Sequence, residues 1–307
     1  MSDTEDLRGS TTDQLRLQDP VKRYPAVTPP PQHQEAPGLE SEMEPRPDLG
    51  ERSYRGTGRL EGRRALVTGG DSGIGAAVAI AFAREGADVA LTYLPAEESD
   101  AQHVARVIEE GGRKVALLPG DLRDHAFCEE VVDRAVEALG GLDVLVNNAG
   151  RQTFAESFED ITDEQLEETF DVNILAMFRV TRRALRHLTP GSAIINTTSV
   201  QSFKPSPILV DYASTKAAIN AYTKALAQQL ASRGIRVNAV APGPVWTALQ
   251  VAGGQPPEKL PDFGKNVPLG RAGQPTELAP AYVFLASSES SFVVGETVHV
   301  NGGTPSP

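Results

Sequence analysis

The hydrophobic and polar positions of this chain change their pattern near residue 58. Before that point, apolar residues are scattered and show almost no periodicity. After it, short continuous apolar runs alternate with longer segments in which apolar residues recur at helical spacing. The apolar runs predict seven buried strands, at residues 65–68, 88–94, 114–121, 142–150, 192–199, 235–243 and 296–303.

The segments between these strands predict helices. The first follows a glycine-rich turn and closes at Gly86, and the others cover residues 100–112, 125–139, 163–188 and 211–233. Strands that alternate with such helices predict a parallel sheet covered on both faces. Right-handed crossovers then give a single doubly wound α/β domain with a seven-stranded parallel sheet.

Residues 1–58 form a proline-rich N-terminal arm that precedes a catalytic domain of residues 59–307. The arm contains eight prolines, including the run at 29–31. Ordering such a segment costs roughly 1–2 kcal/mol per residue, which its few apolar side chains do not offset alone. Two interpretations stay open: a flexible arm, or an arm ordered by packing on its own domain or on a neighbouring subunit. In the second case the apolar anchors are Leu15, Leu17, Val21, Tyr24, Val27 and Tyr54.

Composition excludes several classes of protein. The 307 residues include 41 acidic and 29 basic ones, and the formal net charge of −12 opposes a phosphate-dominated contact with nucleic acid. No apolar run approaches the roughly 18 residues of a membrane span, and the acidic, polar N-terminus is unlike a secretory signal. Cys128 has no disulfide partner within the chain, which favours a reducing compartment. We therefore expect a soluble, cytoplasmic protein that binds neither nucleic acid nor a membrane.

The turn between the first strand and the first helix is rich in glycine. It reads Thr-Gly-Gly-Asp-Ser-Gly-Ile-Gly over residues 68–75. Glycines here let the chain turn tightly and let the backbone approach a pyrophosphate, whose charge the helix N-terminus stabilises. A purely structural turn is the alternative, but its position between the first strand and the first helix favours a dinucleotide site. The expected contacts are Gly69, Ser72, Gly73, Ile74 and Gly75.

Polar and small residues follow two further strands, at the edge where open α/β sheets bind ligands. Asp121 and Leu122 end the third strand, where the Asp121 carboxylate can accept from an adenine amino group, cap the next helix, or do both. Asn148, Ala149 and Gly150 end the fourth strand, where small residues and amides suit the close passage of a cofactor or the bracing of adjacent strands. All five are predicted cofactor contacts.

The end of the second strand bears on the choice between NAD and NADP. A carboxylate there would bind the ribose 2′-hydroxyl and repel a 2′-phosphate. The sequence has Thr92, Tyr93 and Leu94, with no carboxylate before Glu97, which leaves room for NADP. No arginine stands there to bind a 2′-phosphate, however, and Asp71 adds negative charge nearby. We expect NADP or NAD as cofactor, with NADP slightly favoured and Tyr93 among its contacts.

Four polar side chains are candidates for catalysis. Tyr212 and Lys216 are four residues apart in a predicted helix, so both project from one face. Ser199 lies at the carboxyl end of the fifth strand, beside the expected crevice. Asn173 lies in an otherwise apolar stretch of the preceding helical segment, where an amide needs a partner. Tyr212 and Lys216 alone fit an ordinary exposed helix, but Ser199 favours a catalytic interpretation.

Together these motifs resemble the short-chain dehydrogenase/reductase family. The resemblance covers about residues 60–303 and includes, in the family's order, the turn 68–75, Asn-Asn-Ala-Gly at 147–150, Asn173, Ser199, Tyr212 with Lys216, and Ala-Pro-Gly-Pro-Val-Trp-Thr at 241–247. The arm is similar, more loosely, to that of a bacterial branch grouped with general stress proteins and glucose-dehydrogenase-like oxidoreductases. The resemblance implies a Rossmann fold, an NAD(P)-dependent oxidoreductase activity and a homotetramer.

The resemblance also implies a role for each catalytic candidate. Tyr212 is the general acid or base, Ser199 positions the substrate oxygen, and Lys216 activates Tyr212. Asn173 belongs to a proton relay, in which it holds a water. These roles suit the chemistry, because reduction of a carbonyl by hydride creates an alkoxide that must take up a proton. A tyrosine, whose ordinary pKa is about 10, needs a nearby cation to exchange that proton at neutral pH.

The segment after the sixth strand is the last expected contact with the cofactor. The resemblance implies that residues 242–247 contact the nicotinamide, through Pro242, Gly243, Val245 and Thr247. Residues 248–270 combine glycine, proline and scattered apolar residues, and they predict a mobile substrate lid. The lid and its flank contain four apolar residues that either line a substrate pocket or pack on the core, namely Trp246, Leu249, Phe263 and Val267.

The sequence thus predicts an enzyme that moves a hydride between a nicotinamide cofactor and a small carbonyl or alcohol. Such an enzyme is an aldehyde or ketone reductase, or an alcohol dehydrogenase. The five histidines lack the spacing of metal ligands, so no metal is expected. The alternative is a non-catalytic dinucleotide-binding sensor or stress scaffold, which a missing Tyr, Lys or Ser would have favoured.

Overall fold

The predicted strands form one parallel sheet. The structure, a computed structural model, describes residues 13–26 and 28–305. In this part of the chain the strand order is β3-β2-β1-β4-β5-β6-β7, and every neighbouring pair is parallel. The predicted doubly wound fold is therefore confirmed. The strands are β1 (Arg64–Val67), β2 (Asp88–Tyr93), β3 (Val115–Pro119), β4 (Val144–Asn147), β5 (Ala193–Thr197), β6 (Arg236–Pro242) and β7 (Thr297–Val300).

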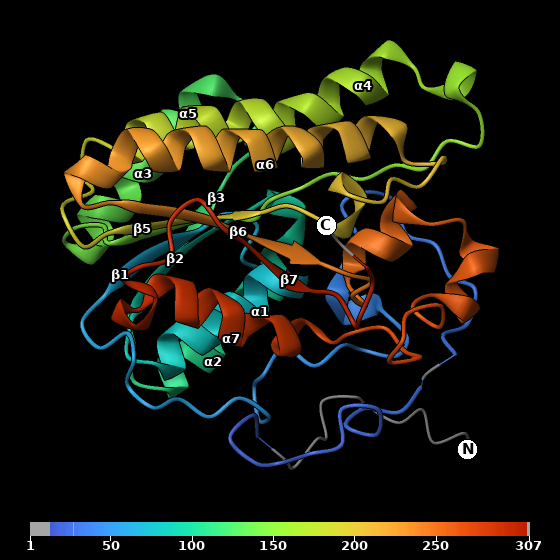
Figure 1. The fold of residues 1–307 in the computed structure, drawn as a ribbon, viewed down its shortest axis with the longest axis horizontal. Helices are drawn as coiled ribbons and strands as arrows, with labels where there is room; N and C mark the ends of the chain where they lie inside the picture. The colour runs from blue at the N-terminus through green and yellow to red at the C-terminus, as the bar shows by residue number, and fades with distance from the viewer. Residues whose placement is uncertain (1–12, 27, 306–307) are drawn as a thin grey trace.

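Helices cover both faces of this sheet (Figure 1). One face carries α1 (Gly73–Arg84), α2 (Glu98–Glu110) and α7 (Pro275–Ala286). The other carries α3 (His125–Leu139), α4 (Asp163–Phe170), α5 (Ala176–Ala184) and α6 (Val210–Leu230). Because the strand order reverses between β1 and β4, a crevice opens at their carboxyl ends, where such folds bind ligands.

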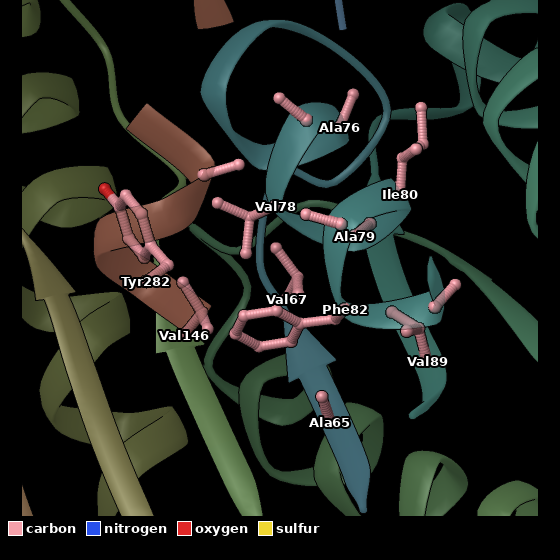
Figure 2. Close-up of a cluster of buried hydrophobic side chains, with 14 of the residues drawn as sticks. Ala65, Val67, Ala76, Val78, Ala79, Ile80, Phe82, Val89, Val146 and Tyr282 are labelled. Carbon is pink, nitrogen blue, oxygen red and sulfur yellow. The ribbon is translucent and has the colours of Figure 1, made fainter. Parts of the chain in front are cut away.

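The core beneath α1 is built mainly from small side chains. Ala76, Val78 and Phe82 of α1 pack in one cluster with Val67 of β1 and Tyr282 of α7 (Figure 2). Ten of the twelve residues of α1 are buried, because the sheet covers one side of the helix and α2 and α7 cover the others. The cluster therefore holds the start of α1 rigidly against the end of β1.

Two helical segments differ from the sequence prediction. The region predicted as one helix over 163–188 is divided by a π-helical turn, η5 (Asp171–Leu175), and α5 ends at Ala184. Helix α7 was not predicted, because Pro275 and Pro280 interrupt a sequence that is apolar on all sides. That apolar character suits a helix packed against both α1 and the sheet, and Pro275 stands in the first turn, where proline is tolerated.

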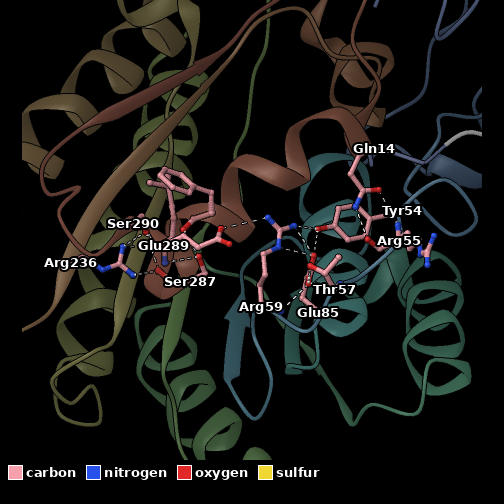
Figure 3. Close-up of polar contacts among 12 residues, drawn as sticks. Gln14, Tyr54, Arg55, Thr57, Arg59, Glu85, Arg236, Ser287, Glu289 and Ser290 are labelled. Carbon is pink, nitrogen blue, oxygen red and sulfur yellow. Dashed lines mark hydrogen bonds and ion pairs between the residues drawn. The ribbon is translucent and has the colours of Figure 1, made fainter. Parts of the chain in front are cut away.

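The described part of the arm packs on its own domain. Tyr54 is buried with α1 and α7, and its hydroxyl donates to Glu85 Oε1 at 2.7 Å (Figure 3). Tyr24 is also buried and donates to Asp48 Oδ2 at 2.6 Å. These contacts favour the ordered interpretation of the arm. The division of the chain at residue 58 stays a prediction.

Three of the other proposed anchors do not pack on their own domain. Leu15, Leu17 and Val21 are exposed, so their prediction as anchors on this domain is wrong, and a contact with a neighbouring subunit stays a prediction. The two tyrosines bury more apolar area per residue, and their hydroxyls find buried partners. Val27 lies outside the described residues.

Candidate active site

A cavity of about 930 Å³ opens along the carboxyl ends of the central strands. It brings together nearly all of the site residues predicted from the sequence. Those that line it are Gly69, Ser72, Gly73, Ile74, Tyr93, Asp121, Leu122, Asn148, Ala149, Gly150, Ser199, Tyr212, Lys216, Pro242, Gly243, Val245 and Thr247. The two exceptions, Gly75 and Asn173, lie just behind its wall.

The glycine-rich turn requires its glycines. Gly69 and Gly73 have φ angles of +61° and +51°, in the left-handed region that favours glycine. A Cβ atom on Gly75 would lie 1.8 Å from the carbonyl oxygen of Gly69, so no other residue fits there. Ser72 precedes α1 but makes no side-chain capping bond. The start of α1 therefore presents backbone amides that an anionic ligand can satisfy.

The Asp121 carboxylate is bound by Arg123 and does not cap the following helix. Its carboxylate accepts from the backbone amide of Arg123 at 2.8 Å and from the guanidinium at 2.7 and 2.9 Å. Burial tends to raise the pKa of Asp121, but these bonds outweigh it and hold the pKa below its usual value. The proposed role of Asp121 as cap of α3 is wrong. Asp124, directly before the helix, accepts from Ala126 at 2.8 Å and caps it.

Asn148 braces two strands at the back of the cavity. Its side-chain amide donates to the carbonyl oxygens of Thr68 and Gly69, at 3.2 and 3.0 Å. Its Oδ1 accepts from the hydroxyl of Thr197 at the end of β5. The amide thus ties the ends of β1, β4 and β5 together while its backbone lines the cavity.

The corner beside Tyr93 is acidic and buried. Asp71 and Glu97 both line the cavity there. Burial raises the pKa of Asp71 well above its ordinary value, and the charge of Glu97 raises it further. Burial also raises the pKa of Glu97. Asp71 Oδ2 is buried without a hydrogen-bond partner, so a ligand hydroxyl at this corner would satisfy it.

Ser199, Tyr212 and Lys216 meet at the other end of the cavity. Lys216 Nζ donates to the carbonyl oxygen of Thr197 at 3.0 Å and lies 5.3 Å from the centre of the Tyr212 ring. Burial lowers the pKa of Lys216 to about 8. Burial raises the pKa of Tyr212 to about 12, against a hydrogen bond with Ser199 that lowers it. A buried acid, a cation and a hydroxyl therefore share one small space.

Asn173 holds the cavity wall from behind. Its Oδ1 accepts from the backbone amide of Arg151 at 2.7 Å, and its Nδ2 donates to the carbonyl oxygen of Arg151 at 2.9 Å. The same Nδ2 donates to Thr215 Oγ1, one residue before Lys216. The π-helical turn η5 carries Asn173, and such turns recur at functional sites.

The lid residues divide between the two roles foreseen for them. Leu249, Phe263 and Val267 line the cavity, as expected of a substrate pocket. Trp246 does not line it and is buried with Met43 and Leu260 in a cluster of its own. Its indole Nε1 donates to the carbonyl oxygen of Pro45 in the arm at 2.8 Å. Trp246 therefore fastens the arm to the domain.

Sequence reasoning missed the contribution of the arm to this site. Residues 35–38 line the cavity, and the buried carboxylate of Glu40 accepts from the backbone amide of Gly73 at 2.6 Å. No local pattern signals these contacts, because 33 residues separate Glu40 from Gly73.

Three further observations concern metal ligands, membrane spans and the single cysteine. Nowhere in the described residues do three or more His, Cys, Asp or Glu side chains gather to hold a metal ion. Among the helices that the structure describes, none is long and apolar enough to cross a membrane. Cys128 is buried in α3, where its thiol donates to the carbonyl oxygen of Leu122.

A Rossmann sheet with this cluster beside a glycine-rich turn defines a class of enzyme. A family model described as Enoyl-(Acyl carrier protein) reductase matches residues 69–305. The chain belongs to the short-chain dehydrogenase/reductase family, as the sequence motifs predicted, and it is an oxidoreductase that uses NAD(P).

Three curated relatives show the branch of the family. The uncharacterized oxidoreductase YghA of Escherichia coli is 55% identical over 94% of this chain and 98% of its own length. General stress protein 39 of Bacillus subtilis is 50% identical over 92% of this chain and 98% of its own length. The chloroplastic NADPH-dependent aldehyde reductase 1 of Arabidopsis thaliana is 48% identical over 87% of this chain and 94% of its own length. The expected resemblance to general stress proteins is confirmed.

A solved structure supports the fold and leaves part of this chain unmatched. The short-chain dehydrogenase of Burkholderia cenocepacia, in complex with NADP, superposes with a TM-score of 0.73 at 36% identity. The match covers 98% of that protein but 80% of this chain, whereas the match to YghA covers 94% of this chain.

Proposed function

We propose that this enzyme transfers a hydride between a nicotinamide dinucleotide and the carbonyl or alcohol carbon of a small molecule. The observation that carries the proposal is the meeting of Ser199, Tyr212 and Lys216 at one end of a cavity whose other end begins at the glycine-rich turn. The proposed substrates are aldehydes, ketones or the corresponding alcohols. Reduction of an enoyl double bond is less well supported, because the resemblance to enoyl reductases implies a wider spacing than that of Tyr212 and Lys216.

The residues at the turn fit a dinucleotide. The start of α1, where Ser72 makes no side-chain capping bond, suits a pyrophosphate, and the unpartnered Asp71 Oδ2 suits a ribose hydroxyl. When bound, the cofactor supplies or accepts the hydride and, in its oxidised form, adds a positive charge near Tyr212. We propose NADP or NAD, with NADP favoured. The raised pKa of Asp71 and of Glu97 lets the corner hold a proton and so reduces its repulsion of a 2′-phosphate.

Tyr212 gives the proton to the substrate oxygen during reduction. Its raised pKa keeps the hydroxyl protonated at neutral pH, which is the form that donates. The tyrosinate left behind would be costly in this buried position without a positive charge nearby. Lys216, whose pKa of about 8 leaves it mostly charged at pH 7, supplies that charge from one helical turn away.

Ser199 positions the substrate oxygen. Its Oγ accepts from the backbone amide of Gln201 at 3.1 Å, and its hydroxyl, which shares a hydrogen bond with Tyr212, can turn to a second partner. In the proposed complex that partner is the oxygen on which negative charge develops. The residue follows the paired strand β5 by two positions and caps the short 3-10 turn Val200–Ser202, so little reorganisation is needed.

Asn173 completes the proposed proton relay. Gly150 lies between Asn173 Oδ1 and Lys216 Nζ, since a Cβ atom on this glycine would be 3.5 and 3.6 Å from the two atoms. Asn173 Oδ1 accepts one described hydrogen bond and retains a second lone pair. We propose that a water held there returns a proton toward Tyr212 through Lys216.

We also propose that the protein is a cytoplasmic homotetramer. Large apolar side chains are exposed along α4, η5, α5 and the start of α6, which suits contact with a second copy. They are Leu166, Leu175, Phe178 and Val210. Light scattering should give four times the mass of the chain, and Phe178→Asp should shift it to a smaller species. A monomer mass for the wild type would contradict the proposal.

The activity is tested with purified protein, NADPH or NADH, and a panel of aldehydes and ketones. The proposal predicts substrate-dependent loss of the absorbance of the reduced cofactor, and production of the corresponding alcohol. Cofactor binding without turnover across a broad panel would instead support the alternative, a dinucleotide sensor or stress scaffold.

A further inference from the structure

One short segment of the arm touches both the lid and the phosphate-binding turn. We call residues 34–40 the strap. The backbone amide of Gln34 donates to the carbonyl oxygen of Val251 in the lid at 3.0 Å. At the other end of the strap, Glu40 binds Gly73 at the start of α1. Between them, residues 35–38 line the cavity.

The strap lies directly against the lid. Gly38 is buried there, and a Cβ atom on it would lie 2.9 Å from Ala252 Cβ and 3.2 Å from the carbonyl oxygen of Ala248. The strap also has its own closure. Gln34 Nε2 donates to the carbonyl oxygen of Leu39 at 3.0 Å, and Gln34 Oε1 accepts from the amide of Leu39 at 2.6 Å. The strap is therefore a closed loop in van der Waals contact with the lid.

Glu40 is fixed from two directions. Its backbone amide donates to Asp100 Oδ2 of α2 at 2.6 Å, and the amide of Ser41 donates to Asp100 Oδ1 at 3.3 Å. The residue is 7% exposed, and its side-chain Oε2 accepts a hydrogen bond from the backbone amide of Gly73. Gly73 has Thr247 on another side, since a Cβ atom on Gly73 would lie 3.0 Å from Thr247 Cγ2. One glycine thus contacts the arm and the segment that leads into the lid.

This arrangement matters for the phosphates of a dinucleotide. The first amides of an α-helix have no partner within the helix. Glu40 takes the amide of Gly73 and so fixes the direction of the turn, which leaves the amides of Ile74 and Gly75 for an anionic ligand. Burial raises the pKa of Glu40 well above its ordinary value. The side chain therefore acts at Gly73 as an uncharged acceptor, which stabilises the helix start as an N-cap does.

We propose that the strap is a positioning element of the cofactor site: Glu40 orients the phosphate-binding turn, and residues 34–38 hold the lid over the cavity. The inference rests on the proposed function, in that the ligand is NADP or NAD. The affinity for the cofactor then depends on a segment outside the Rossmann sheet.

The test is a titration of the full-length chain with NADPH, followed by its fluorescence. Glu40→Ala should raise the Kd about tenfold, in line with the loss of a helix cap. Glu40→Gln keeps an acceptor for Gly73 and should stay within about threefold of wild type. Glu42→Ala, an exposed carboxylate two residues away, is the matched control and should not change the Kd. A Kd for Glu40→Ala equal to or below that of wild type would overturn the proposal, as would an equal loss in Glu40→Gln.

A second pair of variants covers the case in which Glu40→Ala does not fold. Gln34 is half-buried, and Gln34→Ala removes the two hydrogen bonds to Leu39 that close the strap. The variant should raise both the Kd for NADPH and the KM for the carbonyl substrate. Gln32→Ala removes a similar clasp, onto Glu44, that lies outside the strap, and it should change neither. Equal values of Kd and KM for Gln34→Ala and Gln32→Ala would overturn the role of the strap. Failure of the wild type to bind NADPH or NADH would instead contradict the proposed function.

Discussion

At the scale of single residues, Lys216 has the most unusual surroundings. The residue is 3% exposed, and the hydrogen bond described for its ammonium group goes to the neutral carbonyl oxygen of Thr197. Burial disfavours the charged form and lowers the pKa from 10.5 to about 8. The group therefore changes its charge close to neutral pH, beside the hydroxyl of Tyr212.

This surrounding predicts a pH dependence for carbonyl reduction. Lys216 is charged below pH 8 and loses its charge as the pH rises through about 8, and the tyrosinate then loses its stabilising cation. We expect kcat/KM to be steady below about pH 8 and to fall above it. Lys216→Met should be slow and should lose this inflection. Lys224→Met, an exposed position of the same helix, should retain it. An unchanged profile in Lys216→Met would contradict the assignment.

Site residues that lie close together in the sequence were easier to predict than those that only the fold brings together. Tyr212 and Lys216 are one helical turn apart and Ser199 follows a strand, so local patterns found them. Hydrogen bonds join Asn173 to Arg151 and Glu40 to Gly73, and only the fold brings these segments together. A cap of α3 by Asp121 was one of the alternatives left open, but a cap is set by the exact start of the helix, and Asp124 holds that place.

At the scale of elements, the turn between β1 and α1 depends on close backbone contact. Gly75 packs against Gly69 so tightly that even a methyl group would clash with a carbonyl oxygen. A clash with backbone is relieved by moving α1 away from β1, rather than by rotating a side chain. Such a movement would displace the amides that face the phosphates.

Gly75→Ala is therefore expected to lose cofactor affinity. Overpacking costs about 1–3 kcal/mol, which, if it falls on the bound state, corresponds to roughly a fivefold to 150-fold rise in Kd for NADPH. Gly273→Ala is the control, because the nearest atom to its Cβ would be 3.7 Å away. Thermal unfolding of both variants should accompany the titration. Wild-type affinity in Gly75→Ala would show that the turn is not the phosphate site.

Helices and strands were predictable where the apolar residues recur with a single helical or strand spacing. All seven strands were located, and the helix at 125–139 agrees with α3 at both ends. Helix α7 was missed because it is apolar on all sides and contains Pro280. The π-helical turn at Asn173 was missed because one extra residue in a helix leaves no mark in hydrophobic spacing.

At the scale of the whole molecule, a buried polar group joins the arm to the domain. Glu85, at the end of α1, accepts from Tyr54, Thr57 and Arg59 (Figure 3). Burial tends to raise the pKa of Glu85, but the hydrogen bonds from Arg59, Thr57 and Tyr54 lower it to about 2. The junction of the arm and the domain therefore depends on a charged Glu85.

Glu85→Gln tests this junction. We expect a loss of about 2 kcal/mol in the free energy of unfolding, below the value for a fully buried pair because Arg59 is 25% exposed. The stabilisation from a lowered carboxyl pKa is present above pH 4.5 and is lost as the pH falls toward 2, so the variant should lose that part of the acid dependence. Glu289→Gln, whose pair with Arg59 is 3.8 Å long and exposed, is the control. Equal stability of Glu85→Gln and wild type would contradict this account.

The organisation of the whole chain was the least predictable. Proline-rich composition is compatible with a flexible arm and with a packed one, because the composition does not show where Tyr24, Tyr54 and Trp246 find partners. Those partners are Asp48, Glu85 and the carbonyl oxygen of Pro45. Their sequence separations of 24, 31 and 201 residues place them beyond any local pattern.

The central claim is that Tyr212 exchanges the proton during hydride transfer. Its most direct test is kcat for carbonyl reduction by Tyr212→Phe, measured beside the Kd for NADPH. The variant removes one hydroxyl and keeps the ring, so we expect kcat to fall at least about a hundredfold, with a Kd close to that of the wild type. Turnover by Tyr212→Phe at the wild-type rate would contradict the mechanism.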